Sequence, residues 1–138
     1  VKSFEHLVCT EQLSRRLGFK TGEQLIRVVR VRSLNGNARQ VDHGYFLESI
    51  AKGLTPEIAA DSIYGYLEHK RGVKVMASRR TVSVELANDE DCSYLDLGKY
   101  NCVAVMESQS YTSDGILFEV THTRTHPEIF HYRVNSKR

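Results

Sequence analysis

The sequence predicts an α+β fold, an antiparallel sheet with helices packed on it, and three observations support this prediction. Several apolar, β-branched stretches have the length of strands, and two pairs of them are joined by short turn sequences. Hairpin turns outnumber crossover helices, which disfavours a doubly wound parallel sheet. A helix-plus-hairpin order also occurs twice, offset by about 79 positions counted from Gly36 to Gly115, which predicts an internal duplication.

The first copy is a short strand, a helix and a hairpin. Residues 4–8 predict the strand, and residues 10–18 predict an amphipathic helix that begins with a threonine N-cap and ends with a glycine C-cap. Residues 24–34 form a strong β-prone stretch of leucine, isoleucine and valine. The Asn-Gly pair at 35–36 tolerates positive φ and predicts a hairpin turn, from which residues 38–47 return as a strand.

The middle of the chain is predicted to be helical. Residues 55–57, Thr-Pro-Glu, mark a helix start because proline suits the first helical position. Asp61 is a second N-cap candidate, from which a helix would close at Gly72. Residues 73–86 then alternate as a strand.

The second copy repeats the order of the first. Asn88, followed by three acids, predicts a helix start, and the Leu-Gly pair at 97–98 predicts its end. Residues 100–111 and 116–126 are predicted to pair as a hairpin around a Ser-Asp-Gly turn. Residues 130–134 predict a last strand.

Length, composition and charge limit the classes of protein to which the chain can belong. The 138 residues, with 41% apolar and 26% charged, fit one domain and exclude disorder and a membrane-spanning stretch. A net charge of +2 is too small for a DNA-binding surface. Three scattered cysteines without a CxxC motif predict free thiols in a reducing cytosol, and hence a cytoplasmic protein.

The helix that starts near residue 61 is a candidate anion site. If Asp61 caps it, then Ser62, Ile63 and Tyr64 form the first turn, and their backbone N–H groups lack intrahelical acceptors. The positive end of the helix dipole lies there, so a phosphate or carboxylate could bind. The alternative is an ordinary helix whose N–H groups are satisfied by Asp61 itself.

Two arginines and two acids complete the candidate site. Arg30 and Arg32 are two positions apart on one strand, so both side chains leave the same face and could bind phosphate. Asp42 on the returning strand could pair with an arginine or accept hydrogen bonds from a ligand hydroxyl. Glu119 lies on the returning strand of the second copy, and the alternatives are a sugar-hydroxyl acceptor and a surface acid.

Other chemistries find little support. His122, His126 and His131 are spaced by four and five residues in a segment that alternates and contains a proline, which disfavours a metal site. No GxSxG motif indicates a serine hydrolase. No cofactor is predicted.

The whole chain resembles the UTRA domain, the effector-binding domain of the HutC branch of GntR-type bacterial transcription regulators. The resemblance rests on LIRVVRVRSLNGNARQVDHGYF, LTPEIAADSIYGYLEHKRGVKV, YLDL and DGILFEVTHTR, in this order and spacing. Within the family, the stretches DSIYGYLE, VSVELANDEDCSYLDLGKY and ILFEVTHTR are most similar to the trehalose-operon repressor subgroup.

The resemblance implies a fold, partners and site residues. It implies a chorismate lyase-like fold, a homodimer, no enzyme activity, and a phosphorylated sugar such as trehalose 6-phosphate as effector. Operator DNA would bind only a winged helix-turn-helix that precedes a single effector-binding domain spanning residues 1–138. The phosphate would meet the arginines and the helix start, and the sugar would meet the two acids; in sequence order these residues are Arg30, Arg32, Asp42, Ser62, Ile63, Tyr64 and Glu119.

One stretch departs from the family pattern. His126-Pro127-Glu128 stands where the family usually has an Arg-x-Asp pair before an aromatic residue.

Three functional hypotheses remain open. A ligand sensor would couple effector binding to a rearrangement that changes DNA affinity. A chorismate lyase-like enzyme would act on a small carboxylate, but no residue stands out as its catalytic group. An interaction domain with an empty pocket would have Arg30 and Arg32 paired with acids of the protein itself.

Overall fold

The computed structural model describes residues 1–136, which form a six-stranded antiparallel sheet and four short helices. In chain order the elements are β1 (Ser3–Val8), α1 (Glu11–Leu17), β2 (Gln24–Leu34), β3 (Asn37–Leu47), α2 (Pro56–Asp61), α3 (Ile63–His69), β4 (Val75–Leu86), α4 (Asp89–Tyr94), β5 (Cys102–Thr112) and β6 (Leu117–Thr125). The predicted α+β class is confirmed.

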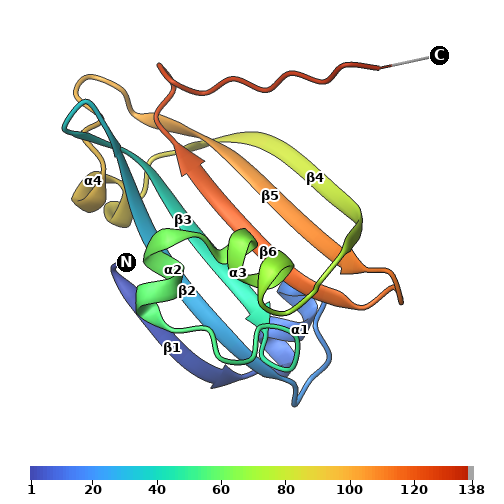
Figure 1. The fold of residues 1–138 in the computed structure, drawn as a ribbon. Coiled ribbons are helices and arrows are strands. Elements are labelled where there is room, and N and C mark those ends of the chain that lie inside the picture. The colour runs from blue at the N-terminus through green and yellow to red at the C-terminus, as the bar shows by residue number, and fades with distance from the viewer. Residues whose placement is uncertain (137–138) are drawn as a thin grey trace.

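The sheet order is β1-β2-β3-β6-β5-β4, and every neighbouring pair is antiparallel (Figure 1). Each half of the chain therefore contributes a strand, a helix and a hairpin, and the two halves meet where β3 pairs with β6. This repeated order agrees with the predicted duplication. It places the returning strands of both hairpins side by side at the centre of the sheet.

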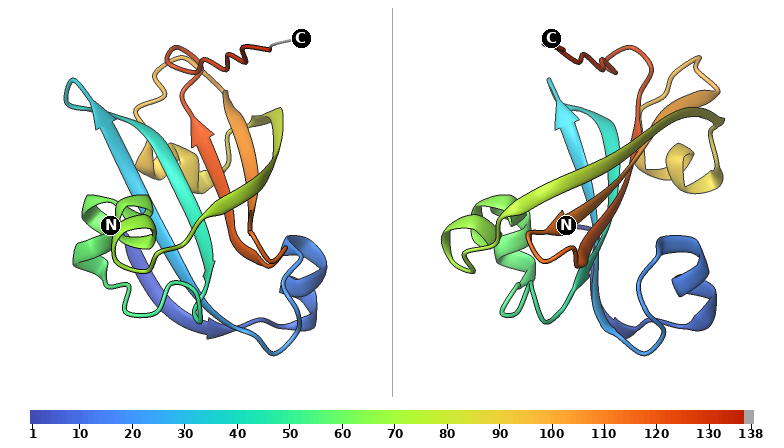
Figure 2. Two further views of the ribbon diagram at one scale, coloured as in Figure 1. Left: turned by 45° about the vertical axis from the view of Figure 1, so that its right-hand side comes forward. Right: turned by 90° about the vertical axis from the view of Figure 1, so that its right-hand side faces the viewer.

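Helices cover different parts of the two sheet faces (Figure 2). The pair α2 and α3 lies on one face, while α1 and α4 lie on the other. Strand alternation supplies both faces with apolar side chains: Ile26 and Val28 point to the α2–α3 face, and Leu25 and Val29 point to the opposite face. All four are at most 3% exposed, so the sheet centre is apolar on both sides.

Local sequence explains where the helices begin. Thr10 and Thr55 each accept a hydrogen bond from the backbone three residues later, and Pro56 takes the first position of α2. Asn88 forms a capping box with Asp91 at the start of α4. Gly18 ends α1 in the left-handed conformation, at φ 101°, as its position predicts.

The helix start near residue 61 lies one residue later than predicted. Asp61 is the last residue of α2, and Ser62, not Asp61, is the N-cap of α3. Ser62 adopts an extended conformation that separates two consecutive helices, so the predicted second helix start exists but is capped by Ser62.

The end of α4 also differs from the prediction. This helix ends at Tyr94, and the Leu-Gly pair at 97–98 lies beyond it. The N–H of Asp96 donates to the carbonyl of Ala38, and the Asp96 carboxylate accepts from the N–H of Ala38, which stops the helix. Leu95 and Leu97 are then buried in the apolar cluster around Val41.

One predicted strand begins later than expected, and another does not form. The N–H of Val73 donates to the carbonyl of Leu67 in α3, so β4 begins only at Val75. Residues 130–134 form no strand. Strand β6 is already paired with β3 on one side and with β5 on the other, so no further strand can join beside it. The chain beyond Thr125 leaves the sheet. Within the described residues, no helix combines the length and the apolar character that crossing a bilayer requires.

Candidate functional site

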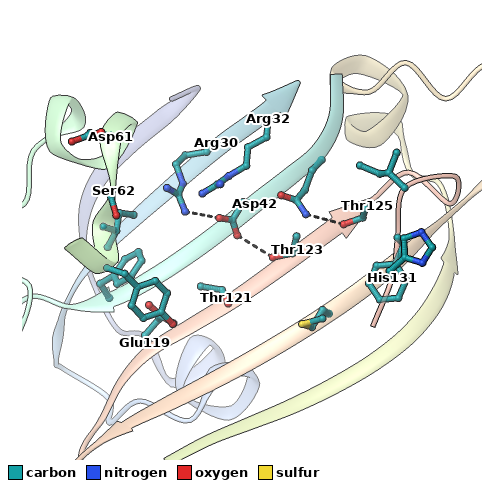
Figure 3. A pocket seen from close by; sticks show the side chains of 17 residues that line it. Arg30, Arg32, Asp42, Asp61, Ser62, Glu119, Thr121, Thr123, Thr125 and His131 are labelled. Atoms are coloured by element: carbon teal, nitrogen blue, oxygen red, sulfur yellow. Dashed lines mark hydrogen bonds and ion pairs between the residues drawn. The ribbon is translucent and has the colours of Figure 1, made fainter. Parts of the chain in front are cut away.

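A pocket of about 490 Å³ opens on the α2–α3 face of the sheet (Figure 3). This volume lies within the range of small-molecule sites, roughly 300–1,000 Å³. Its lining comes from the central strands, the α2–α3 junction and the chain after β6: Arg30, Arg32, Gln40, Asp42, Phe46, Asp61, Ser62, Ile63, Tyr64, Met106, Glu119, Thr121, Thr123, Thr125, Ile129, Phe130 and His131.

Strand register builds the pocket floor. Arg30 pairs with Asp42, Asp42 with Thr123, and Thr123 with Met106, so one row of side chains crosses four strands. At a strand spacing of about 4.8 Å, this row is about 14 Å wide. Because side chains at alternate positions share a face, the neighbouring rows carry the other polar residues of the floor.

Gly44 makes room at the base of the pocket. A Cβ atom at this position would lie 2.7 Å from Cε2 of Phe46, closer than real Cβ contacts. The missing side chain therefore lets the Phe46 ring lie over the strand beside Thr121. Phe46 itself is 2% exposed and belongs to the main apolar cluster.

Arg30 is held by protein groups. Its Nη2 donates to Oδ2 of Asp42 at 2.7 Å, and its Nη1 donates to the carbonyl oxygen of Ala59 in α2 at 3.2 Å. The second carboxylate oxygen of Asp42 accepts from Thr123 Oγ1 at 3.2 Å. Arg30 therefore joins β2, β3 and α2, and the predicted alternative in which Asp42 pairs with an arginine is observed.

Arg32 has a different environment. It lines the same pocket, its side chain is exposed, and it forms no ion pair with any residue in the 1–136 range. Both arginines point from β2 toward the pocket in Figure 3, as their two-residue spacing predicts. Arg32 is thus the guanidinium that can meet an anionic ligand without losing a protein partner.

The start of α3 presents backbone donors near the arginines. Ser62 Oγ accepts from the N–H of Gly65 at 3.0 Å, and the N–H of Ser62 donates to the carbonyl of Ile58 at 3.1 Å. The N–H groups of Ile63 and Tyr64 belong to the first turn and have no intrahelical acceptor. The Ser62 hydroxyl proton is also available to a ligand.

Glu119 is a buried carboxyl group at the base of the pocket. It is 2% exposed, and Oε1 accepts from the hydroxyl of Tyr64 at 2.8 Å and lies 3.4 Å from Ser110 Oγ. Burial raises the pKa of Glu119, an effect that the two hydrogen bonds oppose. Burial and the neighbouring Glu119 together raise the pKa of Tyr64 to about 12, so its hydroxyl stays a hydrogen-bond donor.

The structure brings the seven predicted site residues into one pocket, and the sequence reasoning missed several others. Thr121, Thr123 and Thr125 share the face of Glu119 at two-residue steps, so the alternation of β6 could have revealed them. Gln40 lies two positions before Asp42 on β3, so the same alternation could have placed it on the pocket face. Its Nε2 donates to Thr125 Oγ1 at 3.1 Å. No sequence pattern indicated that residues 129–131 would line the pocket.

The three histidines considered for a metal site lie apart. His122 points to the opposite face, where it pairs with Glu107, and His126 is buried against Tyr100. Only His131 lines the pocket. In residues 1–136 no group of three His, Cys, Asp or Glu side chains is arranged to hold a metal ion.

Comparison with known families identifies the chain's family. The model of the UTRA domain matches residues 1–131. The chain belongs to the UTRA domain family. The resemblance inferred from the sequence motifs is therefore confirmed over nearly the whole length.

Two curated Bacillus subtilis proteins are similar to this UTRA domain. The HTH-type transcriptional regulator TreR is 28% identical over 123 residues, covering 89% of this chain and 52% of TreR. The uncharacterized HTH-type transcriptional regulator YydK is 31% identical over 88 residues, covering 64% of this chain and 37% of YydK. The chain thus spans about half the length of TreR and a smaller share of the length of YydK.

Solved structures show the same fold. The effector-binding domain of the B. subtilis trehalose repressor TreR matches with a TM-score of 0.90 and 26% identity, covering 99% of this chain and 94% of that one. A GntR-family transcriptional regulator from Bacillus cereus matches with a TM-score of 0.84 and 22% identity, covering 98% and 94%. The second likeness concerns the fold alone.

Proposed function

We propose that this UTRA domain is the ligand-sensing part of a cytoplasmic bacterial transcription regulator of the GntR type, a repressor similar to TreR. Its effector is a phosphorylated sugar, with trehalose 6-phosphate as the first candidate. The observation that carries this proposal is the pocket itself. One side combines the guanidinium of Arg32, which has no ion-pair partner among residues 1–136, with the donors at the start of α3. The floor combines buried carboxylates with threonine hydroxyls.

The phosphate would bind between Arg32 and the start of α3. A guanidinium and main-chain N–H groups are suited to phosphate oxygens. Arg32 would supply two donors, the N–H groups of Ile63 and Tyr64 two more, and the Ser62 hydroxyl another. Arg30 would add positive potential while it keeps its bond to Asp42.

The sugar would lie over the floor formed by β3 and β6. Asp42 and Glu119 each have carboxylate oxygens on the pocket side, and hydroxyl groups of a sugar donate well to carboxylates. Glu119 is nine-tenths or more buried, so a ligand hydroxyl would meet it without competition from bulk water. The neighbouring threonines can donate or accept.

The regulator would act by a population shift. Binding of the effector favours one arrangement of the domain or its dimer. This arrangement changes the spacing of the DNA-binding domains attached before residue 1. A coupling of about 1–3 kcal/mol is typical of such systems. Operator DNA would contact only that preceding winged helix-turn-helix, because this domain carries a net charge of only +2.

A homodimer is part of the proposal, and β4 supports it. This strand is a sheet edge whose residues are all exposed, and Val82, Val84 and Leu86 form an apolar row along it, 43%, 72% and 75% exposed. Monomeric proteins seldom leave an apolar edge strand uncovered. Sedimentation analysis of the domain and of a Val84→Lys variant tests it: a dimer that the lysine dissociates is expected.

The test of effector binding is a thermal-shift series with sugar phosphates, each beside its unphosphorylated sugar. Ligand at about 100 times its dissociation constant adds about 2.7 kcal/mol of stability, a shift of several degrees. We expect a shift with a phosphorylated sugar, none with the free sugar, and loss of the shift in Arg32→Ala. Arg16→Ala, which removes an exposed arginine on α1 outside the pocket, is the matched control. Equal shifts with phosphorylated and free sugars would contradict the proposal.

A second candidate has one observation in its favour. An interaction domain with an empty pocket would pair its arginines with protein acids, and Arg30 is indeed paired with Asp42. Arg32 is not so paired within the described residues, which favours the sensor. The known relatives are transcriptional regulators, so we propose binding, not the alternative of a chorismate lyase-like enzyme acting on a small carboxylate.

A further inference from the structure

The chain after β6 forms the end of the pocket farthest from the start of α3. Ile129, Phe130 and His131 lie outside any helix or strand, yet all three line the pocket. Figure 3 shows His131 across the pocket from Ser62 and next to Thr125. We call residues 126–131 the C-terminal strap.

The strap is anchored away from the ligand face. His126 is 1% exposed, and its N–H donates to the carbonyl of Arg39 at 2.9 Å. Its Nδ1 accepts from the N–H of Glu128 at 3.1 Å, which turns the chain back toward the pocket. Tyr100, in the connection between α4 and β5, packs edge-on against the His126 ring and donates its hydroxyl to Glu128 at 2.9 Å. The strap therefore has a defined position that does not depend on Arg32 or α3.

The chemistry of the strap differs from that of the arginine side. Phe130 and Ile129 are half-buried apolar side chains, and His131 is an exposed imidazole. An aromatic wall with a few polar groups at its edge is typical of sites that bury one face of a ring-shaped ligand. In Figure 3 the strap residue His131 lies across the pocket floor from Arg30 and Ser62, on the side away from the place proposed for the phosphate.

We propose that Phe130 and His131 bind the part of a phosphorylated sugar that lies farthest from its phosphate, and so determine a preference for two-ring over one-ring sugar phosphates. Phe130 covers one face of the second ring, and His131 hydrogen-bonds to its hydroxyls. Tyr100 and Glu128 are positioning residues, since they hold the strap without lining the pocket. This inference rests on the function proposed for the pocket.

Isothermal titration calorimetry with two probes tests the inference. Trehalose 6-phosphate has two rings, and glucose 6-phosphate carries the same phosphorylated ring alone. We expect Phe130→Ala to weaken binding of the two-ring probe by about tenfold or more, the effect of losing one well-packed aromatic contact. Binding of the one-ring probe should stay within about twofold of the parent protein, which also shows that the variant is folded.

Two further variants separate ligand contact from general destabilisation. Tyr100→Phe removes the hydroxyl that holds Glu128 and should lower only the affinity for the two-ring probe. Tyr132→Ala changes a 48% exposed side chain on the same segment outside the pocket, and both affinities should stay as in the parent.

Each other outcome overturns a distinct claim. Equal losses for both probes in Phe130→Ala, or no loss for either, would overturn the role of the strap while leaving the proposed function standing. A parent protein that binds neither probe would overturn the proposed function, and the role of the strap with it.

Discussion

Replacing Arg124 by methionine should destabilise the fold strongly, because this side chain neutralises a fully buried carboxylate. Arg124 lies on β6 between two pocket threonines but points to the opposite face. Its Nε and Nη2 donate to the carboxylate of Asp91 in α4 at 2.9 Å, and its Nη1 donates to Glu85 in β4 at 3.0 Å. One guanidinium thus ties α4 and the edge strand to the centre of the sheet.

The magnitude follows from the burial of the partners. Asp91 is 0% exposed, and without Arg124 its carboxylate would keep one hydrogen-bond donor among residues 1–136, the backbone N–H of Asn88. Breaking a buried pair on one side costs about 3–5 kcal/mol. The half-exposed Glu85 adds at most about 1 kcal/mol. For a domain of this size the melting temperature should fall by about 10–20 °C.

Urea unfolding followed by circular dichroism measures the loss, with linear extrapolation to water. The double variant Arg124→Met/Asp91→Asn removes the stranded charge and should be more stable than Arg124→Met alone. A loss below about 1 kcal/mol for the single variant, or a double variant no more stable than it, would refute the reasoning.

Three further predictions concern the pocket. Glu119→Gln should raise stability at neutral pH but not at low pH. Burial raises the pKa of Glu119 above its ordinary 4.5, so the stability that this group contributes is present below pH 4.5 and is lost as pH rises through the folded pKa. Melting curves of the parent and the variant across pH check this, and a pH-independent difference would contradict it. Gly44→Ala should cost about 1–3 kcal/mol in urea unfolding, because the new Cβ meets the Phe46 ring; an unchanged midpoint would show that the ring moves freely. Ser62→Asp should keep the cap of α3 and stay within about 0.5 kcal/mol of the parent, yet abolish phosphosugar binding in calorimetry by repelling the phosphate; retained affinity would place the phosphate elsewhere.

Much of the fold could be predicted from local sequence patterns. Alternation and the Asn-Gly turn placed the first hairpin, and Thr10 with Gly18 placed the first helix, because these patterns depend on backbone preferences within a few residues. Features that depend on tertiary contacts were mispredicted. The early end of α4 depends on hydrogen bonds between Asp96 and Ala38, which lie far apart in the sequence.

In the candidate site, too, features set by local sequence could be predicted, and features set by tertiary contacts could not. Arg30 and Arg32 could be placed on one face from their spacing alone. The pairing of Arg30 with Asp42 at 2.7 Å, which leaves Arg32 as the arginine open to a ligand, follows from hairpin register and could only be offered as one alternative. The strap was unpredictable because its place depends on a buried histidine and on a hydrogen bond from Tyr100.

The central claim is that a phosphorylated sugar binds with its phosphate between Arg32 and the start of α3. A crystal structure of the domain with trehalose 6-phosphate tests this claim most directly. The account predicts phosphate oxygens within hydrogen-bond distance of the Arg32 guanidinium and of the N–H groups of Ile63 and Tyr64, with the Arg30–Asp42 pair intact. A phosphate bound at the strap beside His131, or a pocket left empty at saturating ligand, would contradict it.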